Sequence, residues 1–148
     1  MISLSADFLK AKDIMVKEVV KVNSCTLVDN AVKMMNKNNI GCLIIEDNGE
    51  ARGIVTQRDL LEKVLEKAKD PRKLAVSDIM TQKLVVGNPD MEIHEAARLM
   101  FKRKIKKLPI VENGKLIGLI TLTNIARTVS VDQEMIDIVE KLSNMRAI

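Results

Sequence analysis

Apolar and polar positions follow the same order twice along this chain. In each copy a short apolar run comes first, and a stretch with apolar residues three or four positions apart follows. That spacing gathers the apolar side chains on one face and predicts an amphipathic helix. The helical positions are Val28, Ala31, Val32 and Met35 in the first copy and Ile93, Ala96, Ala97 and Met100 in the second. Thr26 and Asp90 stand near the two helix starts and are candidate caps.

Two further apolar runs follow each helix, and a turn sequence joins them. CLIIE and RGIVT flank Asn48-Gly49, while LPIVE and LIGLIT flank Asn113-Gly114. Asn-Gly between apolar runs indicates a tight hairpin, because both residues tolerate positive φ. Another helix is expected after Thr56, with Leu60, Leu61, Val64 and Leu65 on one face. Each copy is therefore predicted to be strand, helix, strand, strand, helix, which is an α/β arrangement.

A shift of 65 positions, from Asp13 to Asp78, aligns the two copies without a gap. Asp-Ile-Met at 13–15 then falls on the same triplet at 78–80, and Gly53 falls on Gly118. Matching turn glycines and apolar positions indicate a duplicated backbone. The predicted organisation is an N-terminal flanking segment (1–12), a first motif (13–68), a linker (69–77), a second motif (78–128) and a C-terminal helix (129–148).

Composition narrows the classes of protein that fit. The chain has 148 residues, 47% of them hydrophobic but only 1% aromatic, so aliphatic residues and methionine must build its core. No apolar run approaches the roughly 20 residues of a membrane helix, and no long apolar signal segment opens the chain. Cys25 and Cys42 form no paired motif and are expected to be free thiols in a reducing cytoplasm. With His94 as the only histidine, a zinc site or histidine-based triad is not expected. We predict no enzymatic activity.

The order of elements, the two Asp-Ile-Met triplets and the two Gly-x-x-Thr-x-x-Asp/Asn junctions resemble the cystathionine β-synthase (CBS) domain family. Two such motifs in tandem are similar to a Bateman module, and the resemblance covers about residues 10–128. It implies that the two motifs pack about a pseudo-twofold axis and bind adenosine-containing ligands in clefts between them. AMP, ADP, ATP and S-adenosylmethionine are the candidate ligands, and pairing into a homodimer is implied as well.

The junction after Gly53 carries the sharpest candidate residues. Thr56 and Asp59 at a helix start have the spacing of a capping box, which is a purely structural role. The same geometry offers unpaired amides to a phosphate, and a carboxylate can accept two hydrogen bonds from a ribose diol. The resemblance implies that Asp59 binds ribose and that Thr56 contacts ribose or phosphate. The second copy has Thr121 but Asn124 instead of the acid, so two inequivalent sites are expected.

Cations near these junctions could contact phosphate. Arg58 lies in the first turn of its helix, where it is either solvated or able to hold two phosphate oxygens with its planar group. Within the basic run 101–107, Lys102, Arg103 and Lys104 are explained by a helix C-terminus. The resemblance implies phosphate contacts for Lys106 and Lys107, and the sequence does not decide which of the two faces a cleft.

An adenine ring would need an apolar slot with backbone hydrogen bonds. The resemblance implies that two segments form it, the one after each Asp-Ile-Met triplet and the one opening the second strand; the alternative for most of these residues is ordinary core. They are Val16, Val19, Thr81 and Leu84 in the first segment, and Ile40, Gly41, Cys42, Leu43, Leu108 and Pro109 in the second. Gly41 has no side chain, which would let a ligand approach the backbone.

The leading hypothesis is a cytoplasmic, non-catalytic module that senses an adenosine-type molecule and signals to an unknown protein partner or through its homodimer. Nucleic-acid binding through residues 101–107 is an alternative, although Phe8 and Phe101 are the only aromatic residues available for stacking. A structural adaptor without a ligand is a third. No metal, no required cofactor and no membrane contact are expected.

Overall fold

The computed structural model describes residues 9–128 and 132–145, which form two compact units. One unit, Val19–Leu84, contains most of the first copy and is called the repeat-1 unit. The other combines Met1–Glu18 with Val85–Ile148 and is called the repeat-2 unit. The expected flanking segment at 1–12 and the C-terminal helix at 129–148 lie partly outside the described residues.

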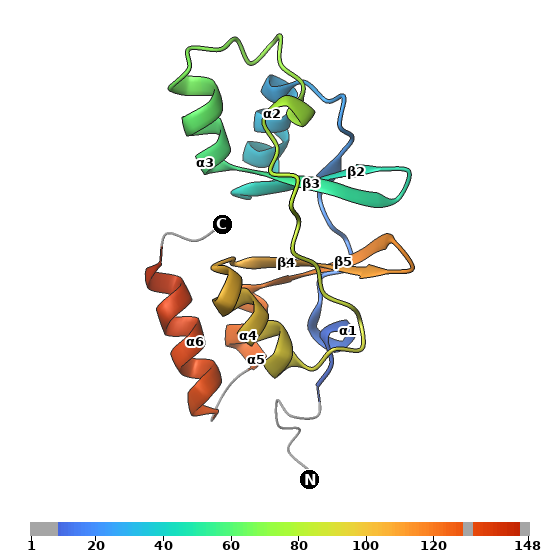
Figure 1. Cartoon of the computed structure of the whole chain (residues 1–148), viewed down its shortest axis with the longest axis vertical. Helices are drawn as coiled ribbons and strands as arrows, with labels where there is room; N and C mark the ends of the chain where they lie inside the picture. The colour runs from blue at the N-terminus through green and yellow to red at the C-terminus, as the bar shows by residue number, and fades with distance from the viewer. Residues whose placement is uncertain (1–8, 129–131, 146–148) are drawn as a thin grey trace. The chain divides into compact units, whose positions relative to one another are not determined.

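The repeat-1 unit has a three-stranded sheet with helices on one face (Figure 1). Strand β1 pairs parallel with β2, and β2 pairs antiparallel with β3, with Ile44 opposite Ile54. Its core gathers the apolar face of the first helix, the inner faces of the hairpin strands and the short helical turn at the end of the linker. The elements are β1 (Lys21–Val22), α2 (Val28–Asn38), β2 (Cys42–Asp47), β3 (Glu50–Thr56), α3 (Gln57–Leu60), the π-helical turn η2 (Leu61–Leu65) and the 3₁₀ turn η3 (Val76–Asp78). The fully or nearly buried core residues are Val28, Ala31, Met35, Leu43, Ile45, Val55, Val64, Val76 and Ile79.

The repeat-2 unit is built on an antiparallel hairpin covered by helices on one face (Figure 1). Among the described residues the first strand of this copy is reduced to a single parallel bridge between Gly87 and Ile110. Its elements are α1 (Ala11–Ile14), α4 (Ile93–Arg103), β4 (Lys107–Glu112), β5 (Lys115–Thr121), α5 (Leu122–Thr128) and α6 (Gln133–Asn144). Helix α6 inserts Met135, Ile138 and Leu142 into the core formed by α4, α5 and the hairpin.

Both predicted Asn-Gly hairpins are confirmed. Asn48 and Gly49 have φ of 55° and 83°, and Asn113 and Gly114 have φ of 51° and 78°. Two consecutive residues with positive φ give the turn whose twist matches that of the flanking strands. The tight turns therefore set the register of each hairpin, and the apolar faces of the strands point into the two cores.

The spatial units do not coincide with the two sequence copies, because each Asp-Ile-Met segment pairs with the hairpin of the other copy. Thr81 and Ile54 exchange two backbone hydrogen bonds of 2.9 and 3.1 Å, and both lie in the repeat-1 unit. Val16 and Leu119 exchange bonds of 2.8 and 2.9 Å in the repeat-2 unit. The boundaries 13–68 and 78–128 thus describe the sequence repeat and stay a prediction for the domains.

The expected leucine face after Thr56 is wrong in part. Val64 is buried, but Leu61 and Leu65 are 56% and 74% exposed. The reason is local: only α3 is α-helical, and the amides of Glu66 and Lys69 donate to carbonyls five residues earlier, at 2.9 Å each. A π-helical turn changes the angular spacing of side chains, so a wheel drawn for 3.6 residues per turn does not describe it. Over the described residues, every helix is too short or too polar to cross a membrane.

Candidate functional site

The junction between β3 and α3 forms the capping box that the sequence predicted. Thr56 is the N-cap, and its Oγ1 accepts a hydrogen bond from the Asp59 amide at 3.2 Å. In return Asp59 Oδ2 accepts from the Thr56 amide at 2.9 Å and from Thr56 Oγ1 at 3.1 Å. Both side chains are buried. This reciprocal bonding satisfies amides at the helix start and fixes the direction of the carboxylate.

The other carboxylate oxygen of Asp59 faces two donors from outside the cap. Lys63 Nζ lies 2.9 Å from Oδ1, and Thr81 Oγ1 donates to the same oxygen at 3.4 Å. Lys63 Nζ also donates to the Ile79 carbonyl at 2.8 Å. A carboxylate accepts about four hydrogen bonds, so these donors and the Thr56 pair occupy Asp59. A ribose diol could reach Oδ1 only by replacing Lys63 or Thr81, the two contacts that do not belong to the helix cap.

Lys63 is a residue that sequence reasoning missed. Its spacing of four positions after Asp59 is the arrangement in which opposite charges meet on a helix surface, and that signal was available. Its contact with the Ile79 carbonyl had no such signal, since Ile79 belongs to the triplet that comes from the second copy. Lys63 therefore links the candidate ribose carboxylate to the segment that precedes Thr81.

The second junction keeps the cap and loses the charges. Asn124 Oδ1 accepts from the Thr121 amide and from Thr121 Oγ1, each at 2.9 Å, and the Asn124 amide donates to Thr121 Oγ1 at 3.1 Å. Thr128 stands at the position of Lys63, and its hydroxyl donates to the Asn124 carbonyl at 2.8 Å. The geometry of the two junctions is therefore alike, while only the first holds a carboxylate and a lysine.

The structure brings the predicted second-strand residues against the two junctions. Gly41 O accepts from the Gln57 amide at 3.1 Å, and Lys106 O, at the equivalent position, accepts from the Leu122 amide at 2.9 Å. Cys42 and Lys107 are the strand partners of Thr56 and Thr121. The backbone around Gly41 is uncrowded, since an added Cβ would approach nothing closer than 3.6 Å, from Gln57.

Other predicted ligand residues are distributed differently. Thr81 lies beside Asp59, whereas Val16 bonds to Leu119 in the repeat-2 unit. The side chains of Leu43 and Leu108 are fully buried in the two cores, so only their backbone could meet a ligand. Ile40 and Leu84 are half-buried within the repeat-1 unit, together with Val19, and Pro109 is buried in β4. Ligand contacts by these residues stay predictions.

Arg58 lies on the exposed side of the first turn of α3. Its Nε lies 2.8 Å from Glu62 Oε1, and its side chain is 46% exposed. An exposed ion pair of this kind is worth about 0–1 kcal/mol, so it is no strong obstacle to a competing phosphate. A phosphate contact by Arg58 nevertheless requires that ion pair to break. A solvent-exposed side chain paired with Glu62 is therefore the simpler interpretation of Arg58.

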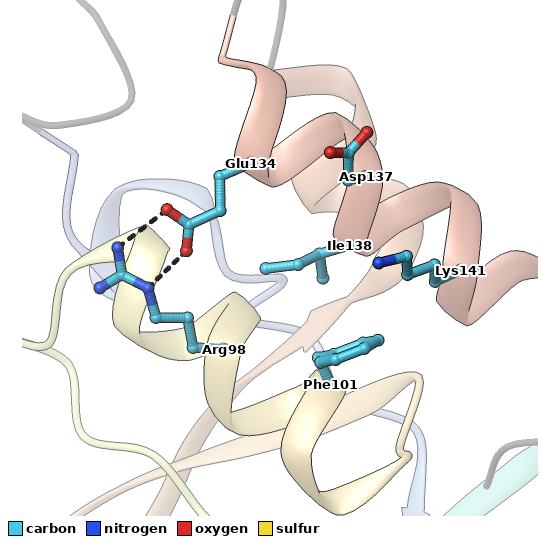
Figure 2. A pocket seen from close by; sticks show the side chains of 6 residues that line it. All are labelled: Arg98, Phe101, Glu134, Asp137, Ile138 and Lys141. Carbon is cyan, nitrogen blue, oxygen red and sulfur yellow. Dashed lines mark hydrogen bonds and ion pairs between the residues drawn. The ribbon is translucent and has the colours of Figure 1, made fainter.

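A hollow of about 290 Å³ between α4 and α6 includes the start of the basic run (Figure 2). Arg98 binds Glu134 with two bonds, of 2.6 and 3.1 Å, and Lys141 Nζ lies 5.8 Å from the centre of the Phe101 ring. Ile138, which also lines the hollow, lies between these two contacts (Figure 2). Since Arg98 is already paired with a carboxylate, the arrangement holds α6 in place rather than offering a free site for an anion.

His94 and Asp132 fix the start of α6 on α4. Asp132 Oδ1 caps the helix by accepting from the Met135 amide at 3.2 Å, and Oδ2 bonds to His94 Nε2. The pKa of the Asp132 carboxyl lies below its usual range, mainly because of the hydrogen bond with His94 and to a smaller extent because of the bond from the Met135 amide. The only histidine of the chain thus has a structural role in helix docking.

Comparison with known proteins gives one consistent result. Protein MK0525 of Methanopyrus kandleri is 37% identical over 123 residues, covering 79% of this chain and 63% of that protein, so this chain spans less than two thirds of that relative. The CBS domain-containing protein YhcV of Bacillus subtilis is 31% identical over 115 residues, covering 78% of this chain and 81% of YhcV. The solved CBS domain pair of protein MJ0100, in complex with 5′-methylthioadenosine and S-adenosyl-L-methionine, has 29% identity and a TM-score of 0.71, covering 80% of this chain and 94% of that one. The CBS domain pattern itself matches twice, at residues 11–66 and 76–131. The chain belongs to the CBS domain family, as a tandem pair of CBS domains.

Proposed function

We propose that this CBS pair is a non-catalytic regulatory module that binds an adenosine-containing ligand and passes its occupancy to another protein or to its own homodimeric state. The ligand class is an adenine nucleotide or S-adenosylmethionine. The observation that carries the proposal is the buried Asp59 carboxylate at a helix start. The helix cap holds its Oδ2, while Oδ1 is contacted by Lys63 and Thr81, two donors that a ligand can displace. The solved pair of protein MJ0100, with its two adenosyl compounds, supports the ligand class.

The first junction is the better ribose site of the two. A hydrogen bond to a charged acceptor contributes about 1.5–3 kcal/mol, and one to a neutral acceptor about 1 kcal/mol. Asp59 can supply the charged acceptor, whereas Asn124 supplies a neutral one at the equivalent position. We therefore expect one tighter site, served by Asp59, and a weaker or differently selective site served by Asn124.

Calorimetric titration of the full chain with AMP, ADP, ATP and S-adenosylmethionine tests the proposal. Asp59→Ala should weaken the tighter site at least tenfold, which corresponds to about 1.4 kcal/mol. Asp59→Asn is the matched control, because it copies the cap that Asn124 makes naturally; it should retain the fold and show an intermediate loss. Absence of saturable binding with all four compounds in ligand-free protein would refute the proposal and leave a structural adaptor.

A further inference from the structure

An apolar groove of about 380 Å³ lies on the helical side of the repeat-1 unit. Val28 and Val32 of α2 form one wall, and Leu60, Val64 and Leu65 form the other. Leu65 is 74% exposed although it lines the groove. A contiguous exposed apolar surface of this kind is typical of a site that another molecule covers.

The second copy shows what fits such a groove. The shift of 65 positions maps Val28 and Leu60 onto Ile93 and Ile125, which are both completely buried. In the repeat-2 unit this face of α4 and α5 is covered by α6 (Figure 1). Helix α6 inserts three apolar side chains at i, i+3 and i+7, namely Met135, Ile138 and Leu142, all of which belong to that core. The duplicated fold therefore carries its own example of an occupied groove.

Charges at the rim select the occupant. Arg98 of α4 binds Glu134 in the first turn of α6 with two hydrogen bonds (Figure 2). In the repeat-1 unit, Lys33 occupies the position equivalent to Arg98, and Lys69 is a second exposed lysine that lines the groove. Within residues 9–128 and 132–145 neither lysine has an ion-pair partner, and Asp29 is the one acid among the lining residues. With two lysines and one acid the lining carries an excess of positive charge, which favours an acidic helix over a second copy of the same groove.

We propose that the groove of the repeat-1 unit binds an amphipathic helix of a partner protein. The helix would present apolar residues at i, i+3 and i+7 and an acidic residue in its first turn, as α6 does in the repeat-2 unit. Lys33 would take the acid, and Leu65 would close over the apolar stripe. This proposal goes beyond nucleotide binding and does not depend on it.

A fluorescent peptide with the sequence of residues 132–145, DQEMIDIVEKLSNM, is the probe, and its anisotropy is measured against the full chain without nucleotide. Leu65→Ser should weaken binding roughly tenfold, since most of one leucine's burial is lost. Leu61→Ser is the matched control, because Leu61 is 56% exposed on the same turn but does not line the groove. Lys33→Glu should weaken the peptide as well, and a peptide carrying Glu134→Lys should restore binding to that variant.

Three results would overturn the proposal. Equal peptide binding by wild type and Leu65→Ser would mean that the peptide binds in place of α6 on the repeat-2 unit and not in the groove. Absence of saturable binding, together with a wild-type dimer in sedimentation velocity that Leu65→Ser dissociates, would assign the groove to a second copy of this chain. Absence of both peptide binding and Leu65-dependent dimerisation would likewise reject docking of such a helix.

Discussion

Gly53 and Gly118 occupy equivalent positions in the two copies, but substitution by alanine should have unequal effects. A Cβ at Gly53 would lie 2.7 Å from the Thr81 carbonyl oxygen and 2.9 Å from Met80 Sδ. At Gly118 the three nearest atoms all belong to the Met15 side chain. Neither glycine has positive φ, so alanine fits the backbone at both sites. The difference between the sites is what the added methyl group must displace.

The expected magnitudes follow from this contrast. Overpacking a buried site destabilises the fold by about 1–3 kcal/mol, whereas replacing glycine with alanine stabilises it by about 0.4–1 kcal/mol because the unfolded chain has less conformational freedom. At Gly53 the obstacle is a carbonyl that also accepts the Ile54 amide at 3.1 Å, so it cannot move without weakening that bond. Gly53→Ala should therefore lower the free energy of unfolding by up to about 2.6 kcal/mol. A methionine side chain can adopt another rotamer, so Gly118→Ala should lie within about 1 kcal/mol of wild type.

Urea unfolding followed by circular dichroism measures both changes, with wild type and both variants at one pH and ionic strength. Gly53→Ala should also weaken nucleotide binding, because displacement of Thr81 disturbs its contact with Asp59. The reasoning is refuted if Gly53→Ala is as stable as Gly118→Ala. It is equally refuted if Gly118→Ala proves the more damaging of the two, since a backbone obstacle would then count for less than a flexible one.

Two further predictions concern charges. The folded-state pKa of Asp132 is depressed, so its contribution to stability is present above the unfolded pKa of roughly 4 and is lost as pH falls through the folded value. Asp132→Ala should lower the melting temperature at pH 6, and the difference in melting temperature from wild type should vanish in strong acid. A difference that persists in strong acid would exclude the His94 pair as its cause. Lys63→Met should remove one of the two donors to Asp59 Oδ1 and tighten calorimetrically measured binding of uncharged adenosine by up to about fivefold, the range of a partly exposed ion pair. Weaker binding would show that Lys63 assists the ligand.

Much of the fold could be predicted because the decisive signals are local. Asn-Gly turns and the three-to-four-residue apolar spacing depend on neighbouring residues, and both hairpins and both main helices formed as expected. The proposed caps Thr26 and Asp90 are wrong for a non-local reason. Helix α2 begins after Leu27, and its first amides donate to the Leu74 and Pro71 carbonyls at 2.8 and 3.0 Å. A backbone partner from the linker makes a side-chain cap unnecessary.

The candidate site divides in the same way. The capping box of Thr56 and Asp59 was readable from spacing alone, and the structure contains it. The approach of Thr81 to Asp59 was not readable, since it depends on an exchange of segments between the two copies. Apolar periodicity reports which face of an element is buried, but it does not report which copy covers that face.

One short helical stretch connects the two proposals for the repeat-1 unit. Asp59 and Lys63 of α3 and η2 face the Asp-Ile-Met segment, while Leu60, Val64 and Leu65 of the same stretch line the groove. A ligand that displaces Lys63 from Asp59 and from the Ile79 carbonyl removes two of the contacts that hold this π-helical turn. The position of Leu65 should then change, and the affinity of the groove for an acidic helix should change with it.

Linkage makes the effect reciprocal, so peptide and nucleotide must alter each other's affinity by the same factor. Titrating the peptide with and without saturating nucleotide, and the nucleotide with and without peptide, measures that factor twice. A factor of one in both directions would separate the two sites and remove this stretch as the link between ligand and partner.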